Sequence, residues 1–111
     1  MFLVIFPAVL PHFKRQPQDL ILPLGRSQPL QCEAVGFPLP SVSWFKDGIE
    51  ITDSNVNLSG LVRTLSGDLL IKELHLSQAG HYFCQASSSV GEMNSTTATV
   101  TVLSKLAGRM I

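Results

Sequence analysis

The chain has 111 residues, which is enough for one domain with a modest hydrophobic core. Its eight Lys and Arg side chains balance its eight Asp and Glu side chains, so the formal net charge is zero. This balance provides no electrostatic attraction to nucleic acid or to an anionic membrane, and we expect neither as a partner.

The N-terminal segment, residues 1–10, is apolar and carries no charged side chain. Its length matches the apolar core of a secretory signal, but a basic leader and a small-residue cleavage site are missing. The run is too short to span a bilayer, so we expect no membrane insertion by this chain. Residues 1–10 are predicted to lie outside the fold, either as a signal-like segment or as an arbitrary start within a longer product.

The rest of the chain is predicted to form short β-strands separated by turns rich in Gly, Pro, Asn and Asp. No stretch has the period of an amphipathic helix. Pro17 interrupts the first strand, where a proline is tolerated at a sheet edge or where a strand changes sheets. Residues 104–111 are expected to form a frayed tail. The expected strands are residues 12–16, 19–22, 28–35, 41–46, 49–51, one short strand within 52–66, 68–74, 80–87 and 93–103.

Alternation along these strands predicts which side chains face the core, because residues two apart in a strand share a face. Tyr82 and Cys84 share a face in this way, and Cys32 lies in a second alternating run. Trp44, the only tryptophan, lies in a third. The other side chains expected to point inward are Leu30, Ala34, Leu69, Ile71, Leu74, Thr96, Ala98, Val100 and Val102.

The order Cys32, Trp44, Tyr82, Cys84, with the tyrosine two residues before the second cysteine, is typical of one kind of two-sheet sandwich. Further motifs fit the same pattern: Gly36-Phe-Pro38-Leu-Pro40, Trp44-Phe-Lys-Asp-Gly48, Gly67-Asp-Leu69-Leu-Ile71 and the Thr/Val alternation near the end. On these residues the segment 11–103 resembles an immunoglobulin-superfamily domain of the I-set type.

The resemblance implies an all-β, two-sheet antiparallel immunoglobulin-like sandwich with one inter-sheet disulfide between Cys32 and Cys84. It also implies that Trp44 packs on this disulfide, and that the Tyr82 hydroxyl bonds backbone upstream of its corner. One residue departs from the family pattern. Gln78 stands where the family usually has an aspartate, and it cannot form the ion pair in which Arg63 would be the partner.

Two tripeptides, Asn57-Leu-Ser59 and Asn94-Ser-Thr96, fit the N-glycosylation acceptor pattern, and neither has a proline in the middle. A disulfide persists in an oxidising compartment. Together these features predict an extracellular location, either as a secreted protein or as the ectodomain of a membrane protein. The alternative is an intracellular relative with two buried, reduced thiols.

No group of residues predicts catalysis, a cofactor or a metal site. His12, His75 and His81 have no accompanying Cys, Asp or Glu cluster at ligand spacing, and we expect them on the surface. The serines of Ser87-Ser-Ser89 lack the glycines of a nucleophile elbow and an activating base. We therefore expect a protein that is not an enzyme.

The best candidates for an interface are apolar side chains that the sandwich cannot bury. Phe37 and Leu39 are expected in a loop between prolines, while Val90 and Met93 flank the turn at Gly91. The resemblance implies that both loops emerge at one end of the fold. Exposed apolar side chains on a rigid backbone favour recognition. The alternative is that Phe37 or Leu39 caps the core, and the competing interface is the flat face of a sheet.

The resemblance thus implies an extracellular recognition or adhesion module that mediates protein–protein interaction. Its partner would be another protein or a neighbouring immunoglobulin domain. Two alternatives stay open: a structural spacer domain of a matrix protein, as in peroxidasin-like proteins, and an intracellular sarcomeric module of the same set. Thiol state and sequon occupancy separate the intracellular alternative from the other two.

Overall fold

The computed structural model describes residues 7–52, 54 and 60–103, which form short strands and one 3-10 turn. In chain order the elements are β1 (Val9–Arg15), β2 (Leu20–Pro23), β3 (Gln28–Leu30), β4 (Glu33–Phe37), β5 (Ser41–Lys46), β6 (Ile49–Ile51), β7 (Leu61–Arg63), β8 (Leu69–Ile71), the 3-10 turn η1 (Leu76–Gln78), β9 (Gly80–Ser88), β10 (Gly91–Asn94) and β11 (Ala98–Leu103).

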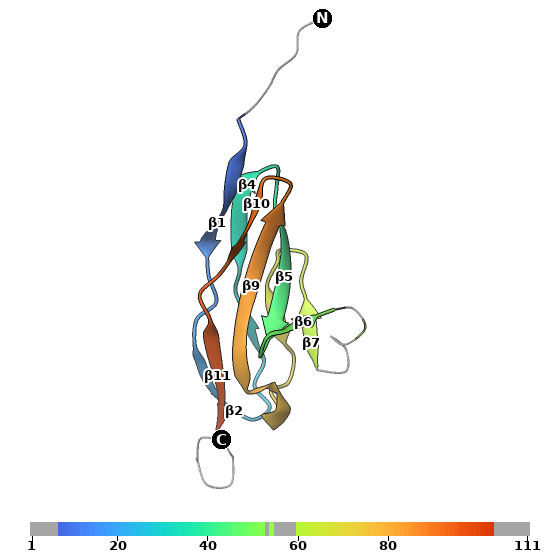
Figure 1. Ribbon diagram of the computed structural model, residues 1–111. Coiled ribbons are helices and arrows are strands. Elements are labelled where there is room, and N and C mark those ends of the chain that lie inside the picture. Colours follow the sequence, from blue (N-terminus) through green and yellow to red (C-terminus); the bar gives the residue numbers. More distant parts are fainter. Residues whose placement is uncertain (1–6, 53, 55–59, 104–111) are drawn as a thin grey trace, which may run out of the picture.

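The strands pack as two layers, which confirms the predicted all-β sandwich (Figure 1). One layer is the sheet β2-β11-β9-β5-β6, to which β10 adds by pairing with β9. The other layer holds the two-stranded sheet β1-β4 and the three-stranded sheet β3-β8-β7. Since β3 and β4 follow each other along the chain, these two small sheets continue one another.

Pro17 marks the place where the N-terminal strand changes sheets. Before it, β1 pairs antiparallel with β4, and after it, β2 pairs parallel with β11. The proline cannot donate to a ladder, and the change of partner leaves no ladder bond for it to make. Strand pairing starts at Val9, so β1 extends into the segment 1–10 that was expected to lie outside the fold.

The single strand predicted over residues 28–35 is divided into β3 and β4. At the division the backbone N–H of Cys32 donates to Asp68 Oδ1 at 2.9 Å, so a side chain replaces a ladder partner. Leu30 and Cys32 are buried as predicted, but Ala34 is only half-buried. β8 is likewise shorter than predicted, although Leu74 beyond its end is buried.

The last predicted strand, residues 93–103, is also divided, into β10 and β11. Asn94 pairs with Gln85 and Ala98 pairs with Tyr82, so β10–β11 has one residue more than β9 between these pairs. Such an insertion is a β-bulge, which re-aims the side chains that it carries. Thr96 lies in the bulge and is exposed, so the prediction that it faces the core is wrong.

The core lies between the layers and contains the residues that define the resemblance. Cys32 and Cys84 are bonded, with their Cα atoms 6.6 Å apart. Trp44 and Tyr82 are buried in the same apolar cluster, and the indole Nε1–H of Trp44 donates to the Gly67 carbonyl at 2.7 Å. The other buried members of the cluster are Leu30, Ile51, Leu61, Leu69, Ile71, Leu74, Ala98, Val100 and Val102.

The Tyr82 hydroxyl donates to the Gln78 carbonyl at 2.7 Å, which confirms the expected bond to backbone upstream of the corner. Gln78 is itself buried, and its side-chain Oε1 accepts from the backbone N–H of His75 at 2.9 Å. Where an aspartate at this position would form an ion pair, the side-chain amide of Gln78 instead stabilises the η1 turn through its hydrogen bond to His75.

Replacing Tyr82 with phenylalanine should lower the free energy of unfolding by about 1–2 kcal/mol, because a buried hydrogen bond is lost while the ring is kept. Thr99→Val is the control, because it removes an exposed hydroxyl that contacts His81 Nδ1 at 3.2 Å. Its effect should stay within about 0.5 kcal/mol. Urea unfolding of both variants measures this difference, and equal losses would contradict the role given to the Tyr82 hydroxyl.

Candidate functional site

Exposed apolar side chains gather at one end of the sandwich, where β1 begins and the β4–β5 and β9–β10 connections lie (Figure 1). This places both predicted segments at the same end. Leu39 is 81% exposed and Phe37 is 49% exposed, so neither belongs to the buried core. We call this surface the apolar end; it consists of Val9, Leu10, Phe37, Leu39, Val90 and Met93.

Close backbone packing holds the apolar end together. Phe37 is the last residue of β4, not a loop residue as predicted, because it pairs with Val9 at the start of β1. Beside it, a Cβ on Gly36 would lie 3.0 Å from the Val9 carbonyl oxygen, so only glycine fits without displacement. The Leu10 side chain lies against the backbone of Gly91. β1 therefore joins Phe37 to the β9–β10 turn.

Val9 and Leu10 were not predicted as part of this site, because residues 1–10 were expected to lie outside the fold, either as a signal-like segment or as an arbitrary start within a longer product. The sequence shows only an apolar run that continues directly into Pro11, and this run does not distinguish a leader from the start of a strand. Met93 lies on β10 opposite Ala86. The alanine is buried, so Met93 points to the core side of the sheet, at the sheet's edge.

The competing surface is the outward face of β5, β9 and β10. At its centre the rings of Phe45 and Phe83 stack, with centroids 4.8 Å apart and planes inclined by 4°. Both rings are half-buried. Neither ring was predicted to have a role, although each residue alternates with buried residues along its strand and therefore faces outward. Around the stack the face is polar, and the Gln85 amide donates to Asn94 Oδ1 at 3.0 Å.

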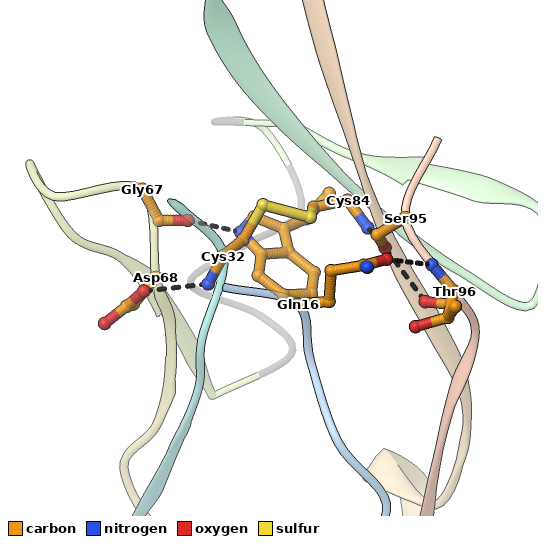
Figure 2. Close-up of a disulfide and its surroundings, with 8 residues drawn as sticks. Gln16, Cys32, Gly67, Asp68, Cys84, Ser95 and Thr96 are labelled. Carbon is orange, nitrogen blue, oxygen red and sulfur yellow. Dashed lines mark hydrogen bonds between the residues drawn. A yellow bond between two sulfur atoms is a disulfide. The ribbon is translucent and has the colours of Figure 1, made fainter. Parts of the chain in front are cut away.

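Hydrogen bonds fix the backbone on both sides of the disulfide, as Figure 2 shows. On the β9 side the Cys84 N–H donates to Ser95 Oγ at 2.9 Å, and the Ser95 N–H donates to the Cys84 carbonyl at 2.8 Å. Next to them the Thr96 N–H donates to Gln16 Oε1 at 2.8 Å. These bonds pair backbone groups in the bulge between β10 and β11, so their role is to stabilise the fold.

The pKa shifts in this domain have structural causes. The backbone N–H of His81 and the amine of Lys46 both donate to the Asp47 carboxylate, and together they lower its pKa. The Asp47 carboxylate therefore stabilises the fold fully at pH values above the usual pKa of aspartate. This stabilisation is lost as the pH falls through the lowered pKa of Asp47 in the folded protein. Burial, with a smaller effect of Asp47, raises the pKa of the Tyr82 hydroxyl.

Within residues 7–52, 54 and 60–103, no group of three His, Cys, Asp or Glu side chains is placed to hold a metal ion. His12, His75 and His81 are exposed, as predicted. In the same described ranges, no helix has the length and apolar character needed to cross a membrane. Of the two predicted sequons, Asn94 is exposed on β10, while Asn57 lies outside the described residues.

The immunoglobulin I-set family model matches residues 11–102. The chain belongs to the immunoglobulin I-set family. It is 35% identical to hemicentin-1 of Homo sapiens over 73% of this chain and 1% of that protein. It is 36% identical to Roundabout homolog 4 of Mus musculus over 81% of this chain and 9% of that protein.

Among solved structures, the titin M10–obscurin-like 1 Ig complex contains a chain that matches with a TM-score of 0.75 and 31% identity, over 88% of this chain and 97% of that chain. The I-set domain thus spans a small part of its curated relatives and nearly the whole of a single immunoglobulin domain. The two curated relatives are extracellular adhesion and guidance proteins that contain immunoglobulin domains. An adhesion-type immunoglobulin module is the function class that these findings support.

Proposed function

We propose that this I-set domain is a non-catalytic extracellular recognition module that binds another immunoglobulin domain through its apolar end. The observation that carries the proposal is the gathering of exposed apolar side chains from β1, the β4–β5 connection and the β9–β10 hairpin at one end. A monomeric domain gains nothing from exposing such a cluster, whereas a partner that covers it removes apolar surface from water.

The composition of the two surfaces favours the apolar end over the sheet face. Leu39 and Leu10 are mostly exposed, so a partner has most of their apolar area to bury. On the sheet face, the stacked Phe45 and Phe83 are already half-buried, and the amides of Gln85 and Asn94 surround them. Covering those amides costs free energy unless the partner replaces their hydrogen bonds.

The proposed partner class follows from geometry and from the relatives. β1 starts at the apolar end, so a domain that preceded this one in a longer protein would face it (Figure 1). The domain also resembles one in a complex between two immunoglobulin proteins. A neighbouring domain in the same protein, which is the spacer arrangement, and a partner in a second protein both fit this surface. The measurement below separates them.

The double substitution Phe37→Ser, Leu39→Ser should weaken binding at least tenfold, which corresponds to about 1.4 kcal/mol, and should leave the melting temperature nearly unchanged. Both side chains are exposed, so little folding energy depends on them. The control is Ile21→Ser, Ile49→Ser, which removes two side chains that are 61% and 70% exposed on β2 and β6, away from the apolar end. Biolayer interferometry against a panel of immunoglobulin ectodomains, with a second copy of this chain included, gives the affinities.

Equal weakening by the control pair would show that exposed apolar area in general, and not the apolar end, drives binding. Unfolding of the double variant would place Phe37 and Leu39 in the core. If no ectodomain and no second copy binds, recognition of a separate protein is wrong and the spacer role is the one left.

A further inference from the structure

We propose that Asn94 carries an N-linked glycan whose first sugar packs on the Phe83–Phe45 stack and covers the outward face of β5 and β9. The inference rests on the proposed extracellular function, because the sugar is attached only in the secretory pathway. The glycan would occupy the outward sheet face, which binding through the apolar end does not use.

The acceptor is presented at a break in the sheet. Asn94 is the last residue of β10 and is exposed, and the bulge that follows carries Ser95 and the exposed Thr96 of the sequon. Gln85 donates to the amide oxygen of Asn94. The nitrogen of that amide, which is the atom that carries the sugar, is not the atom used in this bond.

The stacked rings lie next to this acceptor on the same face. Asn94 pairs directly with Gln85, and Phe83 is two residues from Gln85 along β9, so all three side chains point outward. Such diagonal neighbours in an antiparallel pair are about 7–8 Å apart, which the first sugar of a glycan spans. The ladder between β9 and the last strand stops at Asn94 and resumes at Ala98, so the break lies beside Phe83.

The orientation of the rings favours a sugar as the occupant. Phe45 and Phe83 are paired residues on neighbouring strands, and their centroid separation of 4.8 Å equals the usual spacing of strands. The ring planes therefore stand side by side across the strands, and the second face of Phe83 turns toward the bulge between β10 and β11. An aromatic face carries partial negative charge, and the C–H groups of N-acetylglucosamine carry partial positive charge, so the two attract.

The consequence is a division of the surface. The row Asn94, Gln85 and Ser43 crosses the face next to the phenylalanine pair, so a glycan rooted at Asn94 shields this region from a protein partner. Val90 and the turn lie at the far end of the β9–β10 hairpin from Asn94. Met93 is the neighbour of Asn94 but points to the opposite side of the sheet, so the apolar end stays open. The glycan would therefore direct protein contact to the apolar end.

The test uses the full chain secreted from mammalian cells with a heterologous signal peptide and with Asn57→Gln, so that Asn94 is the one acceptor left. Mass spectrometry should find Asn94 glycosylated. The glycosylated protein should melt about 4 °C higher than its Thr96→Ala counterpart, which keeps the Asn94 amide but destroys the sequon. Trimming the glycan to a single N-acetylglucosamine should keep this difference, because only the first sugar meets the ring.

In a Phe83→Thr background, which keeps a strand-forming residue, the difference between the two proteins should vanish. If this variant does not fold, NMR of the trimmed wild-type protein decides instead: protons of the sugar should be shifted upfield by the ring current of Phe83. An unoccupied Asn94 in secreted protein, an equal gain with Phe83→Thr, or unshifted sugar protons would overturn the inference. None of these outcomes touches the proposed function, because binding by the apolar end can be measured independently on the Thr96→Ala protein, which carries no glycan at Asn94.

Discussion

Trp44→Ala is expected to lower the free energy of unfolding by about 4 kcal/mol. Trp44 is almost completely buried in the cluster that contains Cys32 and Cys84, and its indole N–H donates a hydrogen bond to the Gly67 carbonyl. The substitution leaves a cavity beside the disulfide and an unpaired carbonyl in the turn before β8. For a domain of this size the loss corresponds to a fall in melting temperature of roughly 20 °C.

Phe45→Ala is the matched control for this substitution. Phe45 is the next residue of the same strand and is also aromatic, but it faces outward and is half-buried. Phe45→Ala should lower the free energy of unfolding by less than half as much as Trp44→Ala does. Calorimetry or denaturant unfolding compares the two variants, and a larger loss at Phe45 would show that the outward stack, and not the Trp44 core, carries the stability.

Removing the disulfide by the double substitution Cys32→Ala, Cys84→Ala should cost a similar amount, about 4 kcal/mol. The two cysteines are 52 residues apart, and the cross-link removes the freedom of that loop from the unfolded chain. Changing both residues avoids a lone thiol. Reduction of the wild-type protein is the control, and it should lower the unfolding free energy by nearly the same amount.

Two free thiols labelled in the denatured, unreduced protein would contradict the bond outright. An oxidised protein and a double alanine variant of equal stability would contradict its energetic role. A protein isolated with reduced cysteines would also favour the intracellular alternative over the extracellular one, because the bond persists only where the compartment is oxidising.

The core could be predicted from sequence because its pattern is local. Tyr82 and Cys84 lie two residues apart, and the runs around Cys32 and Trp44 alternate in the same way. Those short patterns fix which side chains enter the sandwich, and all four residues are buried as expected. Pro17 gave an equally local signal for the change of sheet, since its missing N–H excludes a continuous ladder.

The strand breaks could not be predicted, because they depend on residues distant in sequence. Cys32 leaves the ladder because its N–H donates to Asp68, which lies 36 residues away. Thr96 faces outward because its N–H donates to Gln16, 80 residues away, beside a bulge. An alternation rule carries no information on such partners, so both divided strands were predicted as continuous.

The candidate site was predictable in part for the same reason. Phe37, Leu39, Val90 and Met93 were identified because neighbouring turn residues leave them no inward position. Val9 and Leu10 join them only through the pairing of β1 with β4, which is a long-range contact. The Phe45–Phe83 stack requires the pairing of β5 with β9, and the sequence of neither strand alone determines this register.

Hydrogen–deuterium exchange of the domain, free and bound to the immunoglobulin ectodomain that it captures or to its second copy, tests the central claim most directly. Binding through the apolar end predicts slower exchange in residues 36–40 and 88–93, with residues 43–45 and 83–85 unchanged. Protection confined to residues 43–45 and 83–85 would contradict the account and assign recognition to the sheet face.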